Sequence, residues 1–95
     1  MSIGFGIDTG YHNVQITDDD VINAIQYAVL EVFGTPLTTK IVTARKKLAE
    51  GTLYQIVTGV SNAGKTVCKV MIFNIVDKYG ELYVDSYDTL FDGSC

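Results

Sequence analysis

The sequence predicts an α+β fold in which one long helix packs across an antiparallel sheet. Two observations predict it. A single stretch of helical periodicity occupies residues 18–33, and the later segments have the β-branched composition of strands divided by short turns. No internal repeat or low-complexity segment interrupts this order. We therefore expect a single domain over residues 10–95, preceded by a Gly-rich, flexible N-terminal arm over residues 1–9.

The helix has the clearest local signals. Thr17 offers a hydroxyl N-cap, and the acidic residues 18–20 suit the positive end of the helix dipole. Gly34 provides a C-terminal stop, and Pro36 prevents continuation of the helix. Between these ends, apolar side chains recur at helical spacing and form one broad face: Val21, Ile22, Ala24, Ile25, Ala28, Val29, Val32 and Phe33.

Strand composition recurs along the rest of the chain. The predicted strands are residues 11–16, 38–47, 52–60, 65–76 and 81–87. The turn of the first long hairpin is Leu48-Ala49-Glu50-Gly51, and a later turn is Asp77-Lys78-Tyr79-Gly80. We expect residues 88–95 to form a tail.

The charge argues against nucleic acid or an anionic membrane as partner, since both require clustered Lys and Arg, whereas this chain has a net charge of −4. The one basic cluster, Arg45-Lys46-Lys47, lies in a predicted strand. Because side chains of a strand alternate between its two faces, we interpret this cluster as a solvated edge of the sheet. No apolar run reaches the length of a membrane span. The first residues lack the features of a signal peptide, which leaves a mature form of a secreted protein open.

One motif imitates a catalytic site. Residues 59–66 match the phosphate-binding pattern G-x-x-x-x-G-K-[ST], but that loop needs a helix after its Lys-Thr pair, and a strand-like run follows here. The pattern therefore indicates a hairpin turn. His12, the single histidine, is interpreted as a surface residue, and Asp18-Asp19-Asp20 is explained by the helix start without further calcium ligands. We expect no enzyme activity, no metal site and no cofactor.

The two cysteines permit two interpretations. Cys68 lies in a strand-like segment and Cys95 at the end of the sequence. A disulfide between them would close a loop of about 28 residues and stabilise the fold by about 3–4 kcal/mol. Such a bond would indicate an oxidising compartment, whereas two free thiols would suit the cytosol.

Four segments in order resemble the cystatins, a family of protein inhibitors of papain-like cysteine proteases. The segments are residues 24–29 (AIQYAV), 41–47 (IVTARKK), 51–54 (GTLY) and 68–73 (CKVMIF). The similarity runs from about Gly10 to Cys95. It implies a five-stranded antiparallel sheet wrapped around one helix, a secreted protein, and a disulfide between Cys68 and Cys95. The upstream disulfide of secreted cystatins has no counterpart, because the chain has two cysteines.

The resemblance also implies a wedge of three elements that plugs the protease cleft without covalent chemistry. In cystatins these are an N-terminal arm around a glycine, a first hairpin with the pattern Gln-x-Val-x-Gly, and a Pro-Trp pair in the second hairpin. The corresponding positions here are Gly10, Lys47-Leu48-Ala49-Glu50-Gly51, and Val76-Asp77. The glycines are kept, but the Gln, the Val and the aromatic anchor are replaced.

These replacements leave two functions open. The chain is either a reversible inhibitor of cathepsin-like proteases, with weaker binding or an altered target range, or a cystatin-fold binding or structural module without inhibition. Cystatins also exchange their N-terminal halves between chains at the strained first hairpin. Ala49 replaces a β-branched Val there, which relieves strain. We therefore expect a monomer, with a domain-swapped dimer as the alternative.

Overall fold

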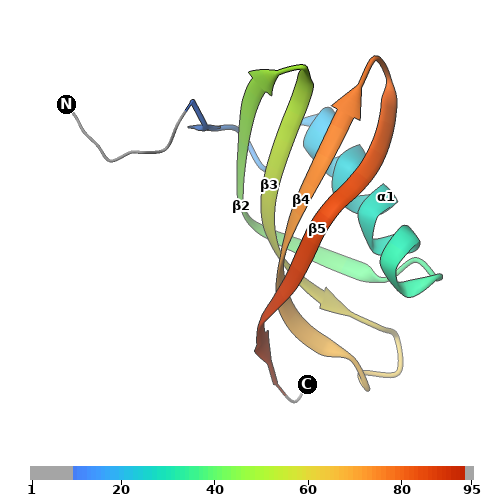
Figure 1. The fold of residues 1–95 in the computed structure, drawn as a ribbon. Coiled ribbons are helices and arrows are strands. Elements are labelled where there is room, and N and C mark those ends of the chain that lie inside the picture. Colours follow the sequence, from blue (N-terminus) through green and yellow to red (C-terminus); the bar gives the residue numbers. More distant parts are fainter. Residues whose placement is uncertain (1–9, 94–95) are drawn as a thin grey trace.

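One helix packs on a five-stranded antiparallel sheet in the computed structural model, which describes residues 10–93 (Figure 1). This arrangement confirms the predicted α+β class. The elements are β1 (His12–Asn13), α1 (Asp19–Phe33), β2 (Thr38–Ala49), β3 (Gly51–Ser61), β4 (Cys68–Lys78) and β5 (Glu81–Asp92). The spatial order of the strands follows the chain, so each strand pairs with its neighbours in sequence. The predicted N-terminal arm, residues 1–9, lies outside the described residues.

The helix ends agree with the sequence signals to within one residue. The side chain of Asp18 is the N-cap and accepts a hydrogen bond from the Asp20 amide at 2.9 Å, so the predicted Thr17 cap is wrong by one position. At the other end Gly34 has φ +76°, and its N–H donates to the Leu30 carbonyl at 2.8 Å. A glycine suits this left-handed conformation because it has no Cβ.

The core lies between α1 and the face of the sheet that the helix covers. Buried positions on β3 alternate strictly, as expected of a strand with one face on the core. The buried cluster consists of Val21, Ala24, Ile25, Ala28 and Val29 from α1, and Ala44, Tyr54, Ile56, Val60, Met71, Phe73 and Ile75 from the sheet. This packing fixes the direction of the long strands and therefore sets where their hairpin tips lie.

Several strand bounds differ from the prediction: β2 extends to Ala49 and β3 begins at Gly51, both within the predicted turn, and the larger differences lie elsewhere. β1 is shorter than the predicted residues 11–16, although the Val14 N–H still donates to the Ala44 carbonyl at 3.0 Å. β4 begins at Cys68 instead of residue 65. β5 continues to Asp92, so the prediction of a tail from residue 88 is wrong, because residues 88–92 pair with the first half of β4.

The segment that matched the phosphate-binding pattern is a hairpin connection organised by Asn62. Its Oδ1 accepts the amides of Thr66 and Val67 at 2.8 and 3.0 Å, and its Nδ2 donates to the Thr66 hydroxyl at 2.6 Å. Lys65 has φ +58°, and β4 follows where a nucleotide-binding loop would need a helix. The interpretation as a hairpin turn is confirmed.

Candidate functional site

Two hairpin tips lie side by side at one end of the sheet, at the top of Figure 1. They are residues 48–51, where β2 turns into β3, and residues 77–80, where β4 turns into β5; we call them together the hairpin end. Thr52 pairs with Asp77, and a Cβ built on Gly51 would lie only 2.5 Å from the Asp77 carbonyl oxygen. The two tips therefore form one continuous surface.

The first tip is very short. Ala49 pairs directly with Gly51, which leaves Glu50 as the single residue between the strands. Gly51 has φ +91° and no space for a Cβ, so both its conformation and its neighbours require glycine. Leu48 is 72% exposed, and Ala49 and Glu50 are also exposed. This tip thus presents a large apolar side chain beside a carboxylate.

The second tip presents an aromatic ring. Tyr79 and Gly80 have φ +56° and +87° and connect the pair Lys78 and Glu81, as in a two-residue type I′ turn. The Gly80 N–H donates to Asp77 Oδ1 at 3.0 Å, which holds the turn. The side chain of Tyr79 is 87% exposed. A rigid turn therefore carries an aromatic side chain at its point.

Val76 and Asp77, which the resemblance placed at the Pro-Trp positions, differ in accessibility. Val76 is only 6% exposed, because its side chain lies in a row between Leu53 on β3 and Tyr83 on β5. Asp77 holds the turn. Sequence reasoning missed Tyr79 as the exposed residue, although the turn Asp77-Lys78-Tyr79-Gly80 contained the signal: in a two-residue turn ending in glycine, the residue before the glycine lies at the tip.

Gly10 lies at the flank of the first hairpin. It has φ +92°, and a Cβ on it would approach Lys47 Cδ to 3.3 Å. The ring of the next residue, Tyr11, has its centroid 5.1 Å from Arg45 Cζ and 5.1 Å from Lys47 Nζ. These distances allow cation–π attraction. Since β1 pairs with β2 directly afterwards, the start of the described chain is held along the edge of β2.

The basic cluster on β2 is accordingly not the solvated edge that the sequence predicted. Arg45, Lys46 and Lys47 are half-buried, and two of the three contact Tyr11. Of the predicted contact residues, all except the buried Val76 lie at or beside the hairpin end: Gly10, Lys47, Leu48, Ala49, Glu50, Gly51 and Asp77.

Tyr54 lies just inside the hairpin end and is buried. Burial raises the pKa of its phenol, and the nearby carboxylates of Asp20, Asp77 and Asp18 raise it further by disfavouring the phenolate. The residue therefore belongs to the core that supports the tips.

Cys68 lies at the start of β4, at the end of that strand away from the hairpin end. The Gly93 N–H donates to the Cys68 carbonyl at 3.1 Å, so the end of β5 runs beside Cys68. Cys95 follows two residues later in the sequence but lies outside the described residues. The disulfide between the two stays a prediction.

The structure of residues 10–93 also bears on the histidine, metal and membrane expectations. His12 is exposed in β1, as predicted. In this part of the chain no three His, Cys, Asp or Glu residues cluster as metal ligands would, and no helix is long and apolar enough to cross a bilayer.

Comparisons of the chain with known protein families, curated proteins and solved structures found no match. The residues that bear on function are therefore those of the hairpin end and those that carry the resemblance.

Proposed function

We propose that this chain is a cystatin-type, reversible and non-covalent inhibitor of papain-like cysteine proteases, secreted and mainly monomeric. One observation carries the proposal: Gly10, the tip around Gly51 and the tip around Tyr79 come from distant parts of the sequence and meet at one end of the molecule. A narrow edge built from three segments suits insertion into an extended cleft.

The side chains at this edge supply a source of affinity. Leu48 and Tyr79 are among the most exposed large apolar residues, and each stands on a short hairpin tip. Burial of such side chains in a pocket contributes most of the energy of many interfaces, and tyrosine is a frequent anchor. In this proposal Tyr79 takes the place of the aromatic anchor that the Val76-Asp77 positions lack.

The tips are also preorganised. Gly51 is confined by the Asp77 backbone, and the Tyr79-Gly80 turn is held by a hydrogen bond to the Asp77 side chain. A contact surface that loses little conformational freedom on binding retains more of its interaction energy. Glu50 acts in the opposite direction, because its charge must be desolvated or paired in the complex. We therefore expect a restricted range of target proteases.

Inhibition kinetics test the proposal. Wild-type protein should inhibit papain or a cathepsin-like protease without being cleaved, and Tyr79→Ala and Leu48→Ala should each raise the inhibition constant about 10-fold or more. Leu90→Ala is the matched control, since Leu90 is also an exposed apolar side chain (56%) but lies near the far end of β5. If wild-type protein at micromolar concentration inhibits neither papain nor a cathepsin-like protease, the proposal is rejected.

A second candidate is a cystatin-fold module that binds a partner other than a protease. The first tip favours it, because Lys47 and Ala49 stand where the cystatin pattern Gln-x-Val-x-Gly has the uncharged Gln and the larger Val. The double variant Lys47→Gln/Ala49→Val separates the two candidates. If only this variant inhibits, the scaffold is competent and the natural chain has another role.

A further inference from the structure

β5 is an edge strand with an unusual surface. It is the last strand in the sheet order, so one side of its backbone faces no other strand among residues 10–93. Every residue from Asp85 to Asp92 is exposed. Large apolar side chains lie along the strand and are 48–65% exposed: Tyr83, Tyr87, Leu90 and Phe91.

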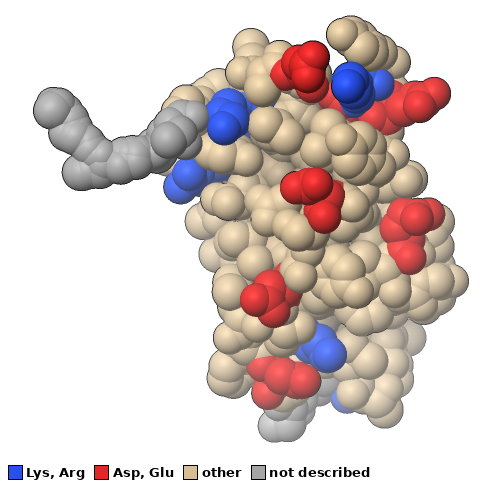
Figure 2. Space-filling view, in the orientation of Figure 1, with Lys and Arg blue, Asp and Glu red and all other residues tan. Residues whose placement is uncertain are grey.

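Acidic residues are interspersed among these apolar side chains. β5 carries Glu81, Asp85, Asp88 and Asp92 and has no Lys or Arg. Among the described residues Asp92 forms an ion pair with Lys69 at 3.7 Å, whereas the other three acidic residues form none. Figure 2 shows acidic side chains spaced over the face that β5 crosses. The exposed edge of the sheet is therefore negative as well as apolar.

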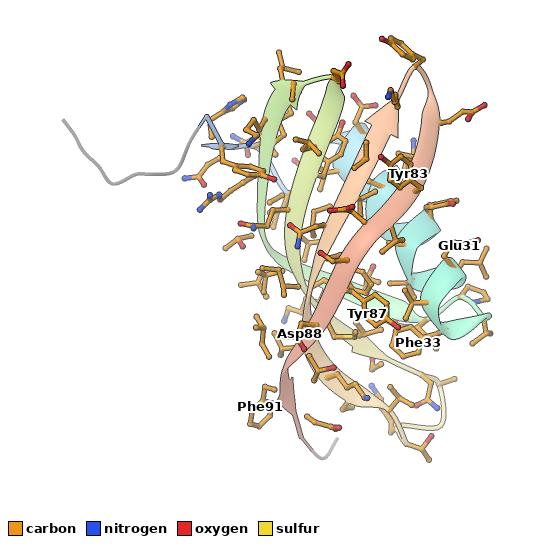
Figure 3. All side chains as sticks on the ribbon, viewed as in Figure 1. Glu31, Phe33, Tyr83, Tyr87, Asp88 and Phe91 are labelled. Atoms are coloured by element: carbon orange, nitrogen blue, oxygen red, sulfur yellow. The ribbon has the colours of Figure 1, made fainter. Side chains whose placement is uncertain are left out.

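A hollow adjoins this edge where β5 passes the last turns of α1. Its volume is about 460 Å³, and its lining includes Glu31 from the helix and Asp85 and Tyr87 from the strand. The Tyr87 ring stacks on Phe73 with centroids 6.0 Å apart, which holds one wall in place. In Figure 3 the labelled residues of β5 follow one another down the strand, with Glu31 and Phe33 on the neighbouring end of α1.

Protection against aggregation explains only part of this surface. Edge strands are commonly guarded by charges and bulges, and β5 has register shifts opposite Val70/Met71 and Asn74/Ile75. These charges would repel β5 of a second copy. A purely protective edge, however, does not need four large apolar side chains beside the charges. The combination suits a segment that is both apolar and basic.

We propose that β5 and the adjoining end of α1 form a docking edge for an extended, basic segment of a partner protein, which pairs with the free side of β5. Backbone hydrogen bonds would align the segment, its apolar side chains would cover Tyr87 on one face of the sheet, and its Lys or Arg side chains would meet Asp88 on the other face. This surface is separate from the hairpin end and does not depend on the proposed inhibitor function.

A second copy of this chain is a poorer partner for β5 than a foreign segment, although the chain has a basic strand of its own. β2 carries the basic residues Lys40, Arg45, Lys46 and Lys47, but β1 already covers the β2 edge at Arg45 and Lys46. Arg45 and Lys47 also contact Tyr11. The edge of β2 is thus covered where most of its basic residues lie, so it cannot pair along its full length with β5 of the next copy.

A fluorescent peptide of alternating lysine and valine tests the docking edge. The full chain should bind it, and amide signals of β5 and of the end of α1 should shift in NMR spectra. A peptide with proline at alternate valines keeps the charge but loses backbone donors, so it should bind about 10-fold more weakly, as expected for one or two lost hydrogen bonds. A peptide with glutamate in place of lysine should not bind.

Two variants of the protein locate the site. Asp88→Asn should weaken binding of the lysine peptide about two- to fivefold, as for an exposed ion pair. Glu50→Gln removes one exposed carboxylate at the hairpin end and should leave binding unchanged. Failure of the lysine peptide to bind, equal binding of the proline peptide, or equal effects of the two variants would each overturn the proposal. Self-association that Asp88→Asn alters would overturn it in favour of a second copy.

Discussion

Replacing Gly51 by alanine tests whether the two hairpin tips are in contact, on which the proposed inhibitory surface depends. Gly51 has φ +91°, and the added Cβ would lie 2.5 Å from the Asp77 carbonyl oxygen and 3.2 Å from Lys78 Cα. Both neighbours are backbone atoms of the second hairpin, so no flexible side chain can move aside. The tips must separate, or the backbone of the first tip must rearrange.

The expected loss of stability has two parts. The left-handed conformation costs a residue with a Cβ about 1–2 kcal/mol. Forcing an extra methyl group into a packed site costs about 1–3 kcal/mol more. Together they lower the free energy of unfolding by about 2–5 kcal/mol, a large part of the ~5–15 kcal/mol of a typical domain. For a domain of this size, Tm should fall by about 10 °C or more.

Two other glycines separate these contributions. Gly80 has φ +87° at the second tip, and no described atom lies within 4 Å of its Cβ position, so Gly80→Ala measures conformational strain alone. Gly64→Ala involves neither a positive φ nor a contact and should be nearly neutral. Urea and thermal unfolding followed by circular dichroism rank the three variants. If Gly51→Ala lowers the free energy of unfolding no more than Gly80→Ala does, the tips are not packed together and the shared surface is refuted.

Three further predictions concern the residues that support the site. Tyr11→Leu should lower the free energy of unfolding in urea by about 0.5–1 kcal/mol, since the cation–π contacts of the ring are lost. Tyr11→Phe keeps an aromatic ring and should keep most of that stability. Equal losses in the two variants would exclude a cation–π contribution. Cys68→Ser should lower the free energy of unfolding by about 3–4 kcal/mol and abolish the effect of a reducing agent; a wild-type protein insensitive to reductant would exclude the disulfide. Because burial raises the pKa of Tyr54, the unfolded chain releases that proton first, so stability should fall as pH rises above about 10. Tyr54→Phe should remove this part of the alkaline decline in urea titrations at several pH values, and an unchanged decline would contradict the assignment.

Local signals were sufficient for the helix and insufficient for the last strand. The caps at Asp18 and Gly34 act through atoms close in sequence, so the sequence predicted the helix bounds within one residue. The end of β5 contains Asp88 and Asp92 and is followed by Gly93, and these residues locally favour a loop. Pairing with the apolar start of β4 overrides that preference, and such pairing is not visible before the strand order is known.

Part of the candidate site could likewise be predicted from local signals, and part could not. Gly51 could be predicted, because a tight hairpin requires a residue that adopts positive φ. The exposed aromatic residue could not be found by matching positions to a family pattern, since one residue of displacement turns a side chain to the other face of a strand. The match selected Val76, which the register buries between Leu53 and Tyr83, whereas the turn geometry selects Tyr79.

Charge shows why composition alone misjudges the available surface. The net charge of −4 suggests a uniformly acidic protein, but the strand order separates a basic β2 from an acidic β5 at opposite sides of the sheet. The two sides are not equally available to a partner. Tyr11 and β1 occupy much of the basic side, while Asp85 and Asp88 on β5 remain exposed without an ion pair among the described residues. A basic partner should therefore be attracted to β5, and raising the salt concentration should weaken that binding while affecting apolar contacts of Leu48 and Tyr79 much less.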